Sequence, residues 1–187
     1  YNFFTSYIMD SKKIRKSIGR LAGWLGLNFS SLIIKAIPER WIYSFAKNMA
    51  ALGFIIARKQ RKIALESLTI AFGQDKTKCE IEQIAKDCFI FMAKAGLELM
   101  FFMDKPELLK KRVEFVGREN LDNALSRGKG VILVSAHFGN FPVMLAKLSL
   151  EGYKTASIMR YMRDERAEKF FVAKRTQVGI KTIYSQP

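Results

Sequence analysis

The prediction of the fold starts from the stretch Gly128 to Pro142, which reads GKGVILVSAHFGNFP. Residues 131–135 form a continuous apolar run bounded by glycine, and this pattern predicts a strand buried on both faces of a parallel sheet. Asn140 is a favourable N-cap and Pro142 suits the first helical turn, so a helix is expected over residues 141–150. Together the strand and the helix indicate one unit of an α/β fold.

Elements of the same kind are expected on both sides of this stretch. Strands are predicted at 113–116, 155–159 and 180–183, and helices at 118–126 and 164–177. Strands that alternate with helices favour a mostly parallel sheet with flanking helices and right-handed crossovers. No helix follows the last predicted strand to cover the sheet, so either the sheet is small or the protein continues beyond Pro187, and we expect the second.

The region before residue 113 has the pattern of helices. Apolar helices are predicted at 20–36 and 40–57, separated at Pro38, and a cationic helix at 58–72. Thr77 and Glu80 have the spacing of a capping box, which predicts the start of a long helix. We expect its buried face to carry the apolar side chains that recur at helical spacing: Ile81, Ile84, Cys88, Met92, Ala95, Leu99 and Phe102.

These patterns divide the chain into three parts. Residues 1–60 are expected to be a basic, apolar, membrane-associating helical segment. Residues 61–112 are expected to be a helical region that packs on the core, and residues 113–187 to be the N-terminal part of an α/β core.

The charge of the chain restricts its partners. Its 187 residues carry 32 Lys and Arg against 17 Asp and Glu, which gives a formal charge of +15. Residues 1–60 combine ten of these cations with apolar runs, which favours an anionic membrane over nucleic acid as the partner. The longest uncharged stretch there, residues 21–34, is shorter than the roughly 20 residues of a spanning helix. We therefore expect interfacial or shallow helices, with one spanning helix as the alternative.

The cysteines and the single histidine limit the chemistry further. Cys79 and Cys88 lie nine positions apart on one predicted helix, too far along its axis for a disulfide, which indicates a reduced, cytoplasm-facing environment. One histidine and no CxxC pair lead us to expect no metal site. A cleaved signal peptide is not expected either, because no small-residue cleavage site follows an early apolar run.

His137 follows the predicted buried strand. It thus lies at the edge of the sheet where α/β proteins bind ligands and where the next helix presents its N-terminus. Gly139 allows a ligand to approach the backbone closely, and Asn140 opens the helix. The alternative for a lone histidine is a structural role, with its ring bonded to a nearby carbonyl, but this position favours function.

Two arginines follow the next predicted strand at the same edge. Guanidinium groups at Arg160 and Arg163 could bind a phosphate through paired hydrogen bonds. Alternatively, they belong to a solvated charge cluster with their neighbours Asp164, Glu165 and Arg166.

The segment 128–141 resembles the signature of the bacterial lipid A biosynthesis acyltransferases, within the wider lysophospholipid acyltransferase group. Residues 61–72 are similar to the arginine-rich helix of that family, and residues 116–121 to its Val-x-Gly-x-Glu-x-Leu segment. The resemblance implies a glycerolipid-acyltransferase-like fold. It also implies transfer of a fatty acyl group from acyl carrier protein to a hydroxyl of a phosphorylated glucosamine lipid, without metal or organic cofactor, at the cytoplasmic face of the inner membrane. A lysophospholipid or another amphiphile is the alternative acceptor.

The resemblance also implies roles for single residues. His137 would be the general base, Gly139 and Asn140 would belong to the substrate-binding turn, and Arg160 or Arg163 would contact the substrate phosphate. In the wider group an Asp or Glu stands five positions after the histidine and orients its ring, whereas this chain has Pro142 there.

Three explanations of Pro142 stay open. A carboxylate from elsewhere could substitute, the candidates being Glu98, Asp164 and Glu165. Asn140 or a backbone carbonyl could orient the ring instead. The protein could also be a catalytically weak relative that binds membranes.

Overall fold

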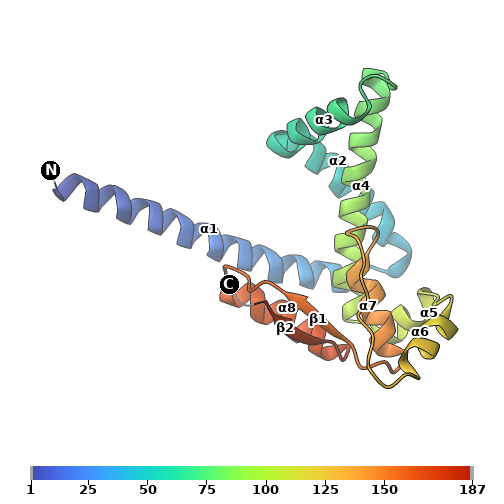
Figure 1. The fold of residues 1–187 in the computed structure, drawn as a ribbon. Coiled ribbons are helices and arrows are strands. Elements are labelled where there is room, and N and C mark those ends of the chain that lie inside the picture. Colours follow the sequence, from blue (N-terminus) through green and yellow to red (C-terminus); the bar gives the residue numbers. More distant parts are fainter. Residues whose placement is uncertain (1, 186–187) are drawn as a thin grey trace.

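The computed structural model describes residues 2–185, which form a mostly helical chain with one small parallel sheet (Figure 1). A short 3₁₀ helix at Glu39–Trp41 precedes α2. The elements are α1 (Asn2–Ala36), α2 (Ile42–Ile56), α3 (Arg58–Phe72), α4 (Lys78–Met103), α5 (Pro106–Arg112), α6 (Arg118–Leu125), α7 (Phe141–Leu150), β1 (Ala156–Met159), α8 (Glu165–Gln177) and β2 (Lys181–Tyr184).

Helix α4 is the central element, and α1, α2, α3, α5, α7 and α8 all contact it. The predicted capping box is present at its start, where the Glu80 backbone N–H donates to the Thr77 hydroxyl and the Thr77 N–H donates to the Glu80 carboxylate. Along α4, the ring of Phe89 meets that of Phe54 from α2 edge to face at 5.2 Å. Helix α1 extends away from the rest of the molecule (Figure 1).

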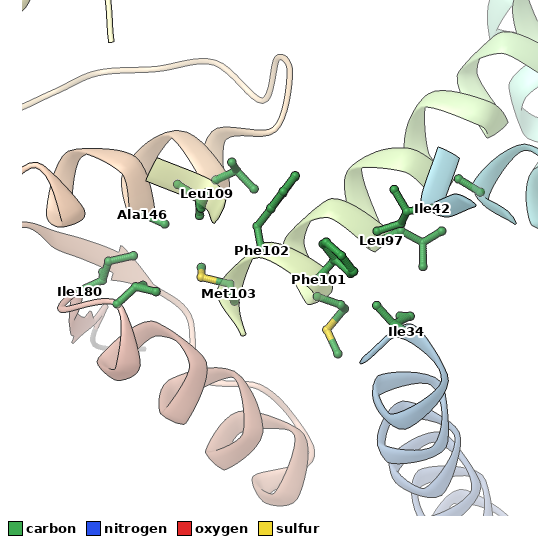
Figure 2. Close-up of a cluster of buried hydrophobic side chains, with 13 residues drawn as sticks. Ile34, Ile42, Leu97, Phe101, Phe102, Met103, Leu109, Ala146 and Ile180 are labelled. Atoms are coloured by element: carbon green, nitrogen blue, oxygen red, sulfur yellow. The ribbon is translucent and has the colours of Figure 1, made fainter. Parts of the chain in front are cut away.

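The hydrophobic core gathers around the C-terminal end of α4. Figure 2 shows side chains from α1, α2, α4, α5 and α7 converging there, together with Ile180 just before β2. Phe101, Ile42 and Leu109 are the largest side chains that are fully buried. One core therefore connects the N-terminal helices with the segment that follows α8.

The buried face of α4 differs from the predicted one. Ile81 and Phe102 are buried as expected, but Cys88 and Met92 are exposed, and Ala85 and Leu97 are buried instead. This helix is apolar on more than one side, so its packing partners decide which side is buried.

The sheet is smaller than predicted. Strands β1 and β2 pair in parallel, with Ala156 opposite Lys181 and Met159 opposite Tyr184, and α8 connects them as expected. The strands predicted at 113–116 and 131–135 are wrong, because no strand in the described part of the chain pairs with either segment. Ile132 and Val134 are 91% and 93% exposed. An apolar extended segment becomes a strand only where a second one supplies its hydrogen bonds, and local sequence does not specify that partner.

The length and apolar character of the N-terminal helices bear on whether one of them could span a membrane. Between residues 2 and 185, no single helix is both long and apolar enough to cross a bilayer. The segments Lys13–Ala36 and Glu39–Ile56 reach that length and apolar character only as a pair, and they are bent by 114° relative to each other.

Candidate active site

His137 lies in the turn that leads from the extended segment 131–135 into α7. Its side chain is exposed. The imidazole packs edge-on against the ring of Phe141, the first residue of α7, with 4.8 Å between ring centroids. The structure therefore leaves the imidazole accessible from solvent and supports it from the side of the helix.

The turn between His137 and α7 requires a glycine. Gly139 has φ of 65°, in the left-handed region that other residues rarely adopt, and a Cβ there would meet no other atom within 4 Å. Its conformation, and not a lack of space, makes glycine necessary. Asn140 occupies the predicted N-cap position, and its carbonyl accepts hydrogen bonds from the N–H groups of Val143 and Met144.

The side chain of Asn140 does not cap α7. Instead its amide nitrogen donates two hydrogen bonds to α4, one to the Ala95 carbonyl and one to the Glu98 carboxylate, each 3.0 Å long. Glu98 thus touches the turn that carries His137. Pro142 lies in the first turn of α7, as expected from its missing N–H.

The two other candidate carboxylates serve α8. Asp164 caps this helix by accepting hydrogen bonds from the N–H groups of Arg166 and Ala167. Its hydrogen bond with the Arg166 side chain, opposed by desolvation and helped by these backbone bonds, lowers the pKa of Asp164 to about 2. Glu165 pairs with Lys169 at 2.8 Å, and this contact lowers the pKa of Glu165. Of the three candidates, Glu98 is the one that contacts the His137 turn.

Arg160 and Arg163 lie between β1 and α8, and both are exposed. Among the residues that the structure describes, neither guanidinium group makes a hydrogen bond or an ion pair within the chain. Arg166, by contrast, pairs with Asp164 at 2.9 Å and lies over the ring of Trp24. The predicted charge cluster therefore splits into residues that hold α8 and two arginines that are available to a ligand.

Two cavities lie beside α7. One of about 800 Å³ is lined by Glu98, by further charged or polar side chains and by an apolar wall: Glu39, Arg40, Tyr43, Arg112, Pro38, Ile42, Phe102, Val113 and Val143. A second cavity, of about 620 Å³, lies between α6, α7 and the extended segments 113–117 and 131–135. Its lining is mostly apolar, and it ends at Ser135, two residues before His137. Both cavities combine apolar walls with a few polar groups, which suits an amphiphilic ligand.

The family model for bacterial lipid A biosynthesis acyltransferases matches residues 9–186. The chain belongs to this family. The match confirms the resemblance and covers nearly the whole sequence. Membership in the lipid A acyltransferase family implies acyl transfer to a lipid-type substrate. No curated protein and no solved structure shows significant similarity to the chain.

In this lipid A acyltransferase family member, the sequence did not predict the role of Glu168, whose carboxylate supports the loop that carries Arg160 and Arg163. Glu168 is 3% exposed and accepts hydrogen bonds from the Met162 N–H, the Arg175 guanidinium and the Tyr184 hydroxyl. It thereby ties the loop between Arg160 and Arg163 to α8 and β2. No local pattern marks Glu168, because a charged residue in an amphipathic helix ordinarily faces water.

Among the residues that the structure describes, no three His, Cys, Asp or Glu side chains come close enough together to hold a metal ion.

Proposed function

We propose that the chain is a membrane-associated acyltransferase. It moves a fatty acyl group from an acyl carrier protein thioester to a hydroxyl of a phosphorylated glycolipid such as a lipid A precursor. Family membership supports the acyl transfer. The observation that carries the proposal is the exposed His137 imidazole, held at the start of α7 beside the Gly139 turn.

In the proposed reaction His137 acts as general base. A neutral imidazole nitrogen takes the proton of the acceptor hydroxyl while its oxygen attacks the thioester carbonyl. The tetrahedral oxyanion then collapses, the carbon–sulfur bond breaks, and the imidazolium returns the proton to the leaving thiolate. The products are the acylated lipid and the free carrier thiol, so the histidine ends in its starting state without an acyl-enzyme.

The start of α7 contributes to the same step. Backbone N–H groups at a helix N-terminus point toward the ligand and favour negative charge, so they can stabilise the oxyanion. Pro142 has no N–H, which leaves this role to the N–H groups before it, those of Gly139, Asn140 and Phe141.

Arg160 and Arg163 are proposed to bind the phosphate of the acceptor. Both guanidinium groups are exposed, and they follow β1 on a loop that Glu168 anchors through the Met162 N–H. Guanidinium groups that are not engaged within the protein can make paired hydrogen bonds to a phosphate.

The N-terminal helix supports the proposed membrane partner. Apolar side chains recur along α1 at helical spacing and face solvent; we call this set the α1 stripe: Ile14, Ile18, Leu21, Leu25, Phe29 and Leu32. An exposed apolar face combined with basic residues favours binding to an anionic lipid surface. The same net charge of +15 suits an acidic carrier protein. We place the enzyme at the cytoplasmic face of the inner membrane.

One observation favours a second candidate function. Pro142 occupies the position where the group carries an acid, so a catalytically weak membrane-binding relative is the alternative. Comparing membrane lipids from cells with and without the intact gene separates the two. If the chain is the enzyme, a phosphorylated glycolipid should lose the mass of one acyl group when the gene is removed. If the chain is the binding protein, the masses of the membrane lipids should not change.

A further inference from the structure

The amide group of Asn140 has both of its N–H donors engaged. One donates to the Ala95 carbonyl and the other to the Glu98 carboxylate, and these two acceptors lie three positions apart on α4. With both donors used, the side chain can offer a ligand or a neighbouring ring only its oxygen, which is an acceptor.

These hydrogen bonds attach the turn before α7 to α4. Asn140 is three residues after His137 and directly follows Gly139, whose positive φ sets the direction of the chain. Between His137 and α7, Asn140 is partly buried, whereas His137 itself is exposed. The amide is therefore the point at which the body of the protein holds this turn.

We propose that Glu98 is a positioning residue for the reaction. Its carboxylate sets the orientation of the Asn140 amide, and thereby the turn that presents His137. In this way a side chain from α4 helps to position His137, although Pro142 occupies the position of the motif acid. This inference rests on the proposed function.

Glu98 is suited to this role by its surroundings. It is half-buried and lines the cavity of about 800 Å³ next to Val143 of α7. A hydrogen bond to a charged acceptor is stronger than one between neutral groups, and partial burial strengthens it further. Asp164 and Glu165 are engaged by the first turn of α8, so they do not compete for this role.

The test compares variants of the full chain in an acyl-transfer assay with acyl carrier protein thioester and a phosphorylated glycolipid. We expect E98A to lower kcat by about tenfold to a hundredfold, with KM for the acceptor changed by less than about threefold. E98Q should retain most of the activity, because the new amide oxygen still accepts from Asn140. The matched control E82A, on the same helix but paired with Lys86 at the surface, should behave like the wild type.

A second pair of variants tests the link between the two residues. N140D places a second carboxylate beside Glu98 and should lower kcat. Adding E98Q should restore part of that loss, since the new glutamine can donate to the new aspartate. A double variant no more active than N140D alone would overturn the inference.

Folding and activity are read separately, with kcat expressed per folded protein from the circular dichroism signal. Wild-type kcat per folded protein in E98A would overturn the role of Glu98, and so would an E98Q variant as inactive as E98A. The variant H137A separates a failure of the inference about Glu98 from a failure of the proposed function. If H137A abolishes transfer while E98A keeps the wild-type kcat, the inference alone fails; if H137A keeps full activity, the proposed function fails.

Discussion

The Arg175 guanidinium lies 3.0 Å from the Glu168 carboxylate, and the two side chains are only 12% and 4% exposed. Glu168 also accepts a hydrogen bond from the N–H of Met162, between the two arginines proposed to bind phosphate. This pair therefore connects the stability of α8 and β2 to the position of the proposed phosphate site.

Removal of Glu168 should strongly destabilise the protein. We expect E168A to lower the free energy of unfolding by about 3–5 kcal/mol, because Arg175 would be left as a buried charge without its partner. The measurement is denaturant unfolding followed by circular dichroism. E165A on the same helix is the control, since Glu165 is 65% exposed and should contribute less than about 1 kcal/mol. Equal effects of the two changes would contradict the role of Glu168.

Arg160 and Arg163 should determine affinity for the acceptor phosphate. We expect R160A and R163A each to raise KM for a phosphorylated acceptor by about tenfold, since each removes charged hydrogen bonds to the phosphate. KM for the dephosphorylated acceptor should not change. K169A provides a control in which a nearby exposed cation is removed. If KM rises equally for both acceptors, the two arginines do not bind the phosphate.

Pro142→Glu tests whether the site lacks an acid. A glutamate in the first turn of α7 is favourable for the helix, so folding should be kept. Because Glu98 already holds the turn, we expect kcat to change by less than about threefold. An increase of tenfold or more would show that Glu98 does not replace the motif acid.

The cap of α8 should give stability a defined dependence on pH. The pKa of Asp164 is lowered from 3.8 to about 2 in the folded protein, so its stabilising effect is complete above pH 3.8 and is lost as pH falls toward 2. We expect D164A to lower the melting temperature by a few degrees at pH 6 and to match the wild type near pH 2. A difference that persists unchanged at pH 2 would show that the charge of Asp164 is not its cause.

The α1 stripe should govern binding to anionic vesicles. Leu25 and Leu32 are 53% and 66% exposed and lie two turns apart on α1. The double change L25E/L32E should weaken partition into phosphatidylglycerol vesicles by at least about tenfold, because it removes apolar area and adds negative charge. V116E makes the same kind of change at an exposed position away from α1 and should have little effect. An equal loss of vesicle partition in both variants would contradict a role of the α1 stripe in membrane binding.

Local signals in the sequence predicted most helices and both observed strands. Helices α3 and α7 have the predicted bounds, and the capping box opens α4. Gly152 and Gly179 end α7 and α8 in the left-handed conformation. Each of these features depends on residues within one or two turns of each other, which is why a single sequence is enough to predict them.

Features that depend on distant partners could not be predicted in the same way. Residues 131–135 have the composition of a buried strand, yet they form no ladder because composition does not supply a neighbouring strand. The contact of Asn140 with Glu98 joins positions 42 apart, and the sequence offered Glu98 only as one of three carboxylates. His137 and its turn were predicted from local pattern, whereas the side chain that holds this turn required the structure.

His137 is proposed to act as the general base in acyl transfer to the lipid hydroxyl. The most direct test of this role is the mass of a phosphorylated glucosamine lipid after incubation with acyl carrier protein thioester and either the wild-type protein or H137A. We expect the wild type to add the mass of one acyl group and H137A to add none. An unchanged mass with folded wild-type protein, or the same increase with H137A, would contradict it.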